Sequence, residues 1–388
     1  MASRRTILVL GPPPTAMGGM ASVVEQILGL DLQNRYRAEL FAATSSAQDD
    51  ENRASRVLRH LRHLVRLHRK IRQTDASVVH IHTCSGFSFF RSVLDMLIAK
   101  MLARPTVLHI HGATFDTFHA GAGTITKWMI RWSLAQADRV VALSKGWHQK
   151  LSAMSPNAQV VIVENAVELP PNPPPRRCDG PCRFVLLARM DEWKGIDDLL
   201  NACEILRDSG VAFEVHLAGP AGTAGDSQTL PTNIESRGLD RHVRYLGPLR
   251  GDAKTDLLRC ADAYVQPSHN EGMPIALLEA LSFGLAIVAT DVGAVGEVIT
   301  NQREGLLVAS HRPDALAAAM RALIEEPSFR VAAGIAGRRL AESRFSLSRL
   351  DDDLCRLYDD TLAGGGLSAR AFTNNSGGVV RPISRAAV

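Results

Sequence analysis

Short apolar segments alternate with amphipathic segments over most of the chain. In the first half, runs of five or six largely apolar residues occur at Thr6–Leu10, Val78–His82, Thr106–His111 and Arg139–Leu143. The segments between them repeat apolar residues every three or four positions, as helices do: Gly19–Leu30, Arg53–Ile71, Phe89–Leu102 and Thr124–Ala137. Buried strands that alternate with helices predict an open, parallel α/β sheet.

A proline-rich segment, Leu169–Cys182, interrupts this alternation. Proline stiffens such a stretch into an extended linker in which no core can form. The alternation then restarts, with strands expected at Phe184–Ala188, Phe213–Ala218, Val243–Leu246, Ala263–Gln266 and Ala286–Ala289. Helices are expected at Ile196–Asp208, Pro274–Phe283 and Asp314–Glu325. The sequence therefore predicts two Rossmann-like domains, 1–168 and 183–345, whose parallel sheets face each other across a cleft.

The last part of the chain differs from both domains. Ser348–Leu362 is amphipathic and predicts a closing helix within residues 346–363. Residues 364–388 are rich in Gly, Ser and Asn, and we expect them to be disordered.

Composition and charge exclude few classes of protein. The 388 residues carry a formal net charge of +4, which by itself does not indicate a nucleic-acid-binding protein. The close pair Cys178 and Cys182 has no second Cys or His pair at zinc spacing, so we expect no structural zinc. The other cysteines are scattered, which favours a reducing compartment. Because Thr6–Leu10 is too short for a signal peptide or a membrane span, we expect a cytoplasmic protein.

The strongest chemical signal follows the strand predicted at Ala263–Gln266. There the chain turns and enters a helix, with Pro274 at the expected first helical position. Backbone amides at this tip would face the cleft without helical partners, and the helix dipole would add to their attraction for an anion. The tip consists of Gly272, Met273, Pro274 and Ile275. We expect it to hold phosphate.

Two glutamates flank this predicted phosphate site. Glu271 precedes the helix and Glu279 lies inside it. A nucleotide sugar has the order sugar, diphosphate, ribose, so Glu271 could accept hydrogen bonds from sugar hydroxyls and Glu279 from the ribose. The alternative is a surface loop with Glu279 on a solvated helix face. Because the helix around Glu279 is almost wholly apolar, we expect that carboxylate to be buried beside a partner.

Arg189 and Lys194 follow the first strand of the second domain. At the carboxyl end of a strand their charges can neutralise a diphosphate and stabilise the negative charge that grows on a leaving group. An ordinary basic loop is the alternative, and the position at the mouth of the cleft favours the site.

The first domain contributes weaker candidates at its own strand ends. Gly18 and Gly19 let the backbone approach a phosphate or a sugar, although their spacing is not the GxGxxG of dinucleotide-binding proteins. His111 ends the strand predicted at Thr106–His111, and Asn165 ends a further strand predicted at Val160–Glu164, so both would project into the cleft. A tight turn and buried structural side chains are the alternative interpretations.

Together these segments resemble the GT-B glycosyltransferases of family 4, the retaining family described as glycosyl transferases group 1. The resemblance runs from Gly11 to about Val308, and the E-x7-E element formed by Glu271 and Glu279 is its most specific part. Six further segments agree with it: Gly18–Gly19, His111–Gly112, Arg189–Gly195, Ala218–Pro220, Tyr245–Gly247 and Asp291–Glu297. The sequence departs from the family at Ala188, where Gly is usual, and at Asn165–Glu168, where Asn-Gly-Val-Asp is usual.

The resemblance implies a hexosyltransferase that uses a UDP- or GDP-sugar, retains the α configuration and needs no metal or other cofactor. Glu271 would bind the donor sugar, Glu279 the ribose, and Arg189 and Lys194 the diphosphate. The leaving diphosphate would take the proton of the acceptor hydroxyl. The remaining roles fall to Gly19, which would close over the diphosphate, His111, beside the reacting sugar, and the nucleotide loops at Gly219 and Gly247.

Two alternative functions use the same architecture. The first is another GT-B enzyme, such as a sugar-nucleotide epimerase or a phosphorylase. The second is a non-catalytic protein that binds sugar nucleotides. The charged residues expected in the cleft favour an enzyme, and E-x7-E together with R-x4-K-G favours transfer.

Arg53–Arg72 is densely basic. It combines one apolar stripe (Val57, Leu58, Leu61, Leu64, Val65 and Ile71) with seven surrounding Arg and Lys residues. Packing on the first sheet explains the stripe, and the charge density predicts contact with anionic lipid. We therefore hypothesise a peripheral contact with the inner face of the plasma membrane and a saccharide or lipid-linked saccharide acceptor, in cell-surface polysaccharide synthesis. Nucleic acid is not expected, since no stacking platform or reading motif accompanies the helix.

Overall fold

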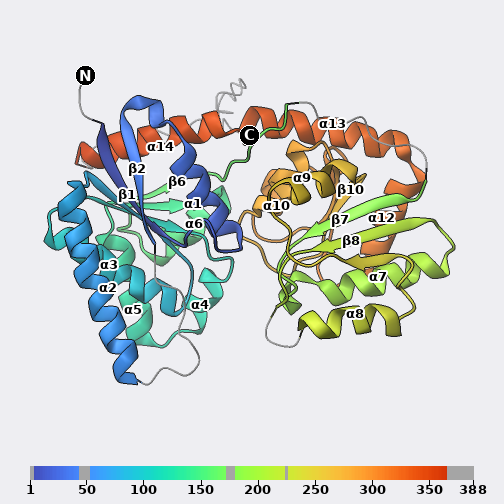
Figure 1. Ribbon diagram of the computed structural model, residues 1–388, viewed down its shortest axis with the longest axis horizontal. Coiled ribbons are helices and arrows are strands. Elements are labelled where there is room, and N and C mark those ends of the chain that lie inside the picture. Colours follow the sequence, from blue (N-terminus) through green and yellow to red (C-terminus); the bar gives the residue numbers. More distant parts are fainter. Residues whose placement is uncertain (1–3, 43–52, 172–179, 223–225, 365–388) are drawn as a thin grey trace, which may run out of the picture.

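A computed structural model describes residues 4–42, 53–171, 180–222 and 226–364 (Figure 1). These residues form two parallel sheets of six strands each. The first sheet has the order β2-β1-β3-β4-β5-β6 and comprises β1 (Arg5–Gly11), β2 (Tyr36–Ala42), β3 (Val78–Thr83), β4 (Thr106–Ile110), β5 (Arg139–Ala142) and β6 (Val160–Ile162). The second has the order β12-β11-β10-β7-β8-β9 and comprises β7 (Cys182–Leu187), β8 (Phe213–Ala218), β9 (Val243–Tyr245), β10 (Ala263–Gln266), β11 (Ala286–Thr290) and β12 (Gly305–Val308).

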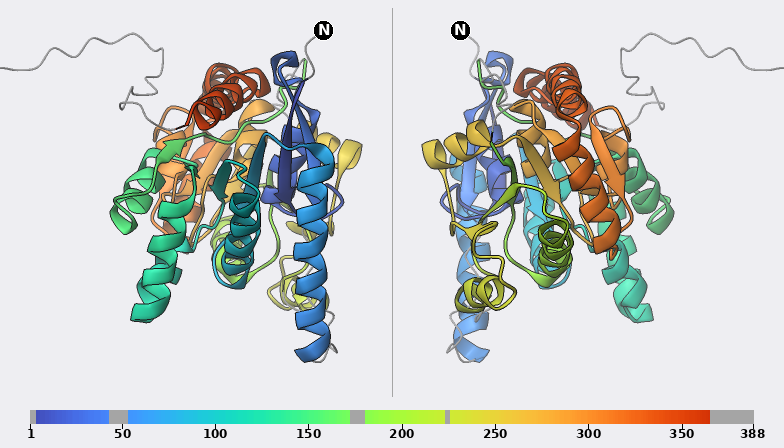
Figure 2. Two further views of the ribbon diagram at one scale, coloured as in Figure 1. Left: turned by 90° about the vertical axis from the view of Figure 1, so that its left-hand side faces the viewer. Right: turned by 90° about the vertical axis from the view of Figure 1, so that its right-hand side faces the viewer.

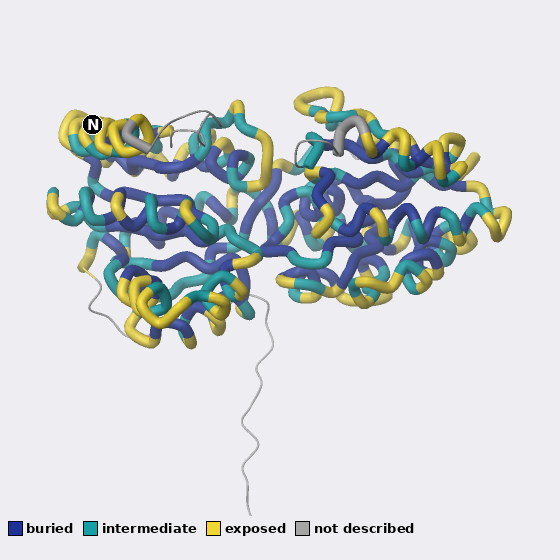
Figure 3. Tube along the Cα trace, turned by 90° about the horizontal axis from the view of Figure 1, so that it is seen from below, coloured by how far each residue is buried: buried dark blue, intermediate teal, exposed yellow. Residues whose placement is uncertain are grey.

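Helices cover both sheets. Around the first sheet lie α1 (Gly19–Gly29), α2 (Arg53–Thr74), α3 (Phe87–Met101), α4 (Phe115–Gly121), α5 (Thr124–Gln136) and α6 (Lys145–Met154). Around the second lie α7 (Ile196–Asp208), α8 (Asp226–Ser236), α9 (Gly251–Cys260), α10 (Ile275–Ser282), α11 (Val295–Val298), α12 (Pro313–Glu325) and α13 (Pro327–Arg344). Figure 3 shows the buried strands at the centre of each domain. The predicted pair of parallel α/β domains is confirmed.

Two strands were not predicted. β2 alternates polar and apolar residues, with Arg37 and Glu39 inside it, and β12 has only four residues. Both lie at the edge of their sheet, where one side of the strand faces no neighbour and a continuous apolar run is not required. The prediction for Pro274 also needs correction. This residue is extended and precedes α10, which begins at Ile275.

The C-terminal helix returns to the first domain. α14 (Leu347–Leu362) follows α13 and crosses from one domain to the other along the top of Figure 1. Its Tyr358 ring packs edge-on against Tyr36, with 5.4 Å between ring centroids. Asp359 accepts a hydrogen bond of 2.5 Å from the Tyr36 hydroxyl and forms an ion pair with Arg35. The helix therefore joins the two domains by packing as well as by chain connection. Residues 365–388, where we predicted a disordered tail, lie outside the described residues, as does Cys178 of the predicted linker.

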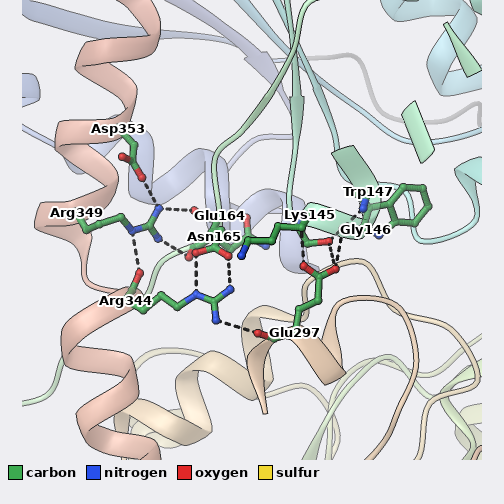
Figure 4. A network of polar contacts seen from close by, with 10 residues as sticks. Lys145, Gly146, Trp147, Glu164, Asn165, Glu297, Arg344, Arg349 and Asp353 are labelled. Carbon is green, nitrogen blue, oxygen red and sulfur yellow. Dashed lines mark hydrogen bonds and ion pairs between the residues drawn. The ribbon is translucent and has the colours of Figure 1, made fainter. Parts of the chain in front are cut away.

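A glutamate of the second domain caps a helix of the first (Figure 4). Glu297, on α11, accepts hydrogen bonds from the Ser144 hydroxyl at 2.7 Å and from the backbone amides of Lys145 and Gly146 at 2.9 Å each. These groups form the beginning of α6, whose first amides have no partners within the helix. The negative charge of Glu297 also interacts favourably with the positive end of the α6 helix dipole. Glu297 therefore holds the two domains together through one helix end.

Arginines near the α13–α14 junction add a second set of bonds between the domains (Figure 4). Arg344 forms an ion pair with Glu164, which follows β6. Arg349 donates to the carbonyl oxygens of Glu164 and Asn165 at 2.9 and 2.7 Å, and pairs with Asp353 at 2.8 Å. The chain segment that crosses between the domains is thus fixed by polar contacts on both sides.

Removing the Glu297 carboxylate should weaken this joint. We expect Glu297→Ala to lower the free energy of unfolding by about 2 kcal/mol, since three hydrogen bonds to a charged acceptor are lost and the amides of α6 become free. Urea denaturation followed by circular dichroism measures this loss. Glu342→Ala is the matched control, because it removes a half-exposed carboxylate that pairs only within α13. Equal effects of the two variants would contradict the role given to Glu297.

The prediction of one packed apolar stripe on α2 is wrong for the first half of that helix. The side chains of α2 that pack are the fully buried Leu67 and Ile71 together with the buried His63. Figure 2 shows that the first half extends past the end of the sheet. It meets the first domain through another face: the His60 ring lies 5.4 Å from the Phe87 ring, and His63 Nε2 lies 2.8 Å from Asp95 Oδ1 of α3. Four residues of the predicted stripe are therefore 46% to 58% exposed: Val57, Leu58, Leu61 and Val65.

Candidate active site

A cavity of about 700 Å³ lies between the two domains. Loops at the carboxyl ends of β1, β4, β7, β8 and β10 line it, the place where open α/β sheets bind ligands. All but one of the site residues predicted from the sequence line this cavity: Gly18, Gly19, His111, Asn165, Arg189, Lys194, Gly219, Glu271, Gly272, Met273, Pro274, Ile275 and Glu279. The structure therefore brings together residues that are up to 261 positions apart (18 to 279) in the sequence.

Glu271 and Lys194 form a buried ion pair inside the cavity wall. Lys194 Nζ donates to Glu271 Oε1 at 2.6 Å, and Ser268 Oγ donates to the same oxygen at 2.7 Å. The two side chains are only 15% and 7% exposed. The Lys194 ammonium also lies 4.1 Å from the centre of the Trp193 ring. A positive and a negative group are thus held side by side, and each can bind a different part of a polar ligand.

Glu279 has the partner that its apolar helix led us to expect. Lys254 Nζ of α9 donates to Glu279 Oε1 at 2.6 Å, and both residues line the cavity. The Glu279 side chain is 18% exposed. Sequence reasoning required a partner for this carboxylate but did not identify Lys254, because 25 residues and a strand separate the two.

Two arginines lie at the edge of the cavity. Arg189 is 59% exposed, and its Nε donates to Asp191 Oδ2 at 2.5 Å. Arg250, which we did not predict, reaches across from the second domain and donates to the carbonyl oxygens of Thr15 and Pro14 at 2.6 and 3.4 Å. The loop that leads into α1 is therefore tied to the opposite domain.

The tip of α10 faces the first domain at close range. A Cβ atom on Gly19 would lie 3.8 Å from Ile275, and one on Gly272 would lie 3.3 Å from the His111 carbonyl oxygen. Asn165 is buried, and its amide donates to the Met273 carbonyl oxygen at 2.8 Å. Asn165 thus holds the loop before α10 in place. It also lines the cavity, so the contact with ligand that the sequence suggested stays a prediction.

Gly247 is the predicted site residue that does not line the cavity. Its carbonyl oxygen accepts a hydrogen bond of 2.8 Å from the Gly219 amide, and the Tyr245 hydroxyl donates to the Gly219 carbonyl at 2.9 Å. Gly219 has φ +149°, and a Cβ there would lie 1.7 Å from the Ala188 carbonyl oxygen. The loop after β9 therefore supports Gly219 from behind. The β8 and β7 ends approach closely enough that only glycine fits.

His111 is uncharged in this setting. Its Nε2 atom lies 2.8 Å from Nδ1 of His82, and burial lowers the pKa of His111 to about 3. The ring is therefore neutral near pH 7. It can donate or accept a hydrogen bond but brings no positive charge to the cavity.

Two groups of side chains in the described residues have the composition of metal sites. His80, His82 and His109 are buried. In the second group Asp198 and His269 are partly exposed and His311 is exposed. Within each group the candidate ligand atoms lie within 4.8 Å of one another. Neither group lines the cavity.

Both halves of the chain match known family models. Residues 176–340 match the model described as glycosyl transferases group 1, and residues 17–169 match glycosyltransferase family 4. A D-inositol 3-phosphate glycosyltransferase of Jonesia denitrificans is 28% identical over 182 residues, which cover 46% of this chain and 43% of that protein. The chain spans about half the length of the curated relatives it matches.

Solved structures share the whole fold. Sucrose-phosphate synthase from Thermosynechococcus elongatus has a TM-score of 0.78 at 17% identity, covering 93% of this chain and 100% of that one. The Anabaena protein HepE, solved with UDP-glucose, has a TM-score of 0.70 at 16% identity, covering 92% and 99%. The arrangement of the two domains is therefore common to these proteins.

Proposed function

The chain belongs to the group 1 glycosyltransferases with the GT-B fold, and from this premise we propose that it is a retaining hexosyltransferase. Its donor would be a UDP- or GDP-sugar and its acceptor a saccharide or lipid-linked saccharide, in cell-surface polysaccharide synthesis. One observation carries the proposal. Lys194, Glu271 and Glu279 line a single cavity around the tip of α10.

The order of these groups suits a nucleotide sugar. Lys194, the free amides at the start of α10 and the exposed Arg189 supply positive charge for a diphosphate. Glu271 on one side can accept from sugar hydroxyls, and Glu279 inside the helix can accept from the ribose. The related fold of HepE was solved with UDP-glucose, which supports a donor of this class.

The proposed mechanism needs no protein nucleophile. As the glycosidic bond to the diphosphate breaks, the leaving oxygen becomes negative, and Lys194 and the helix tip stabilise that charge. The same leaving group takes the proton of the acceptor hydroxyl, which attacks from the same face, so the configuration is retained. Because fixed cationic groups and amides can stabilise this charge, we propose that no divalent metal is required.

The function is tested with a panel of UDP- and GDP-sugars. The true donor should raise the melting temperature, since it binds the folded state alone. Radiolabelled donor should then give labelled saccharide product, in the presence of EDTA as well as without it. Conversion of the donor sugar without transfer would show an epimerase, and a need for inorganic phosphate would show a phosphorylase. Binding with no turnover, unchanged by Glu271→Ala, would show a non-catalytic protein.

We also propose that α2 contacts a lipid surface, where a lipid-linked acceptor would be held. α2 exposes Leu58, Leu61 and Val65 at helical spacing, with the exposed Arg62 and Arg66 beside them. Apolar side chains that insert among headgroups, flanked by arginines that pair with anionic lipid, are the features of an interfacial helix. No helix in the described part of the chain has the length and apolarity needed to cross a bilayer.

Charge reversal on α2 tests this surface. We expect the double variant Arg62→Glu/Arg66→Glu to reduce binding to phosphatidylserine-containing vesicles by about tenfold or more, at about 1 kcal/mol per basic residue removed. Co-sedimentation with anionic and neutral vesicles measures it. Arg241→Glu/Arg244→Glu makes the same charge change on exposed residues of the second domain and should have little effect. Equal binding of wild type to both vesicle types would reject the lipid contact.

A further inference from the structure

Four histidines stack beside the cavity. His80 and His82 of β3 lie next to His109 of β4 and His111, which follows it, and His82 is paired with His109 in the strand register. Neighbouring rings in this histidine stack are 4.2 to 5.3 Å apart between centroids. His111 lines the cavity, and the other three are at most 3% exposed. The other three rings therefore lie behind His111 and separate it from the core of the first domain.

All four rings are neutral. Burial lowers the pKa of each one, to about 3 for His80 and His111 and well below the ordinary value for His82 and His109. A neutral imidazole has one N–H, so one nitrogen donates and the other accepts. The positions of the four protons then follow from the hydrogen bonds that the stack makes.

Two ring nitrogens without partners show where the protons of the stack lie. The Nε2 atoms of His82 and His109 are buried and have no hydrogen-bond partner in the part of the chain that the structure describes. A buried N–H without a partner costs about 1–3 kcal/mol and is rare. The proton of each ring therefore sits on Nδ1. His109 then donates to His80 Nε2 at 3.2 Å, and His80 donates from its own Nδ1 to the Tyr358 hydroxyl at 2.9 Å.

The same reasoning applies to the contact between His82 and His111, the histidine that lines the cavity. Its Nδ1–H donates to His111 Nε2 at 2.8 Å, so the proton of His111 must lie on Nδ1. We infer that His82 is a positioning residue that fixes His111 as the Nδ1–H tautomer, so that the ring offers a ligand a donor and no acceptor. Such a ring selects an oxygen acceptor, a sugar hydroxyl or a phosphate oxygen. That choice of ligand rests on the proposed function, whereas the tautomer does not.

A metal ion held by His80, His82 and His109 is the competing interpretation. Both ring nitrogens of His80 already have hydrogen-bond partners: Nε2 lies 3.2 Å from His109 Nδ1, and Nδ1 lies 2.9 Å from the Tyr358 hydroxyl. A metal ion bound by His80 would have to break one of these contacts. The contacts therefore favour the hydrogen-bonded chain.

Nitrogen-15 NMR of the full-length protein, labelled at histidine, tests the tautomer directly. We expect His111 Nδ1 to show the shift of a protonated nitrogen and Nε2 that of an unprotonated one, assigned by comparison with His111→Gln. His82→Asn keeps an N–H donor near the position of Nδ1 and should preserve this pattern. His82→Phe keeps a stacked ring without a donor and should give a mixture of tautomers. A protonated Nε2 in the wild type would overturn the inference, as would a change of the His80 and His109 signals on adding Zn²⁺ alone.

Binding of UDP and turnover of UDP-glucose provide the second readout. His82→Phe should lower kcat/KM about five- to tenfold, which is the effect of losing one hydrogen bond. His82→Asn should restore most of the lost kcat/KM. His80→Phe breaks the contact to Tyr358, so it should lower the melting temperature while the His111 tautomer stays unchanged. A wild type that turns over no sugar nucleotide but shows the expected tautomer would reject the proposed function and leave this inference standing. An unchanged tautomer in His82→Phe would reject the inference alone.

Discussion

Replacing Lys194 by methionine is expected to lower kcat for sugar transfer by about 10²–10³-fold, the usual effect of removing one group that stabilises transition-state charge. Methionine keeps the length of the apolar side chain against Trp193 but removes the ammonium group. The Lys194 side chain is 15% exposed and lies at the cavity wall, where charge would grow on the leaving diphosphate. In such a partly dehydrated site its effect on the transition state exceeds what the same charge achieves in water.

The same substitution leaves Glu271 without its counter-charge. Glu271 is buried, and breaking a buried ion pair from one side is strongly destabilising, so Lys194→Met should also lower the melting temperature. The double variant Lys194→Met/Glu271→Gln removes both charges and separates the two effects. We expect it to recover thermal stability and to remain as inactive as the single variant. Single-turnover rates and melting temperatures measured on all three proteins test this.

A recovery of turnover in the double variant would place the effect in folding and would contradict a catalytic charge on Lys194. Lys194→Arg refines the test. The guanidinium keeps the charge but cannot occupy the space of the ammonium, so a partial loss of kcat is expected.

The strands whose sequence pattern reflects local burial were predicted correctly. The central strands of both sheets are apolar runs because helices cover both of their faces, and the sequence shows each run directly. The resemblance to group 1 glycosyltransferases is likewise confirmed by both family models. The edge strand β2 lacks such a run and the edge strand β12 has only four residues, and both were missed.

Contacts between distant segments were not predictable from periodicity. Nothing in the spacing of Lys254 or Arg250 shows that α9 lies beside the cleft, since this depends on how the second sheet twists. The apolar positions of α2 predicted a packed stripe, but the helix packs in part through His60 and His63, which the spacing of apolar residues does not indicate. The path of α14 to the first domain was likewise hidden, because an amphipathic helix does not show which surface it covers.

Because the cavity carboxylates pair directly with lysines, a ligand must replace these ion pairs when it binds. Lys194 pairs with Glu271 and Lys254 pairs with Glu279, each at 2.6 Å, so the charges in the cavity wall balance in pairs. A nucleotide sugar brings acceptors on its phosphates and donors on its hydroxyls. Binding can therefore exchange partners, with the phosphates taking the lysines and the hydroxyls the carboxylates, and no buried charge is left alone.

Removing the Glu279 carboxylate should abolish recognition of the ribose. We expect Glu279→Ala to raise KM for the nucleotide sugar by about 10–100-fold with kcat nearly unchanged, because a hydrogen bond to a charged acceptor contributes about 1.5–3 kcal/mol in ground and transition states alike. The sharper measurement compares the donor with its 2′-deoxy and 3′-deoxy analogues. The wild type should prefer the intact ribose, and Glu279→Ala should bind all three donors equally.

Two variants control for indirect effects on the cavity. Glu25→Ala removes another carboxylate of the cavity wall, on α1, and should leave the preference for the intact ribose in place. Glu279→Gln keeps an acceptor oxygen without the charge and should retain part of the preference. Because Lys254 loses its partner in Glu279→Ala, the double variant Glu279→Ala/Lys254→Met checks that a freed ammonium does not mask the loss by binding phosphate. If Glu279→Ala still discriminates against the deoxy donors, the ribose is bound by other groups, and the role proposed for Glu279 is rejected.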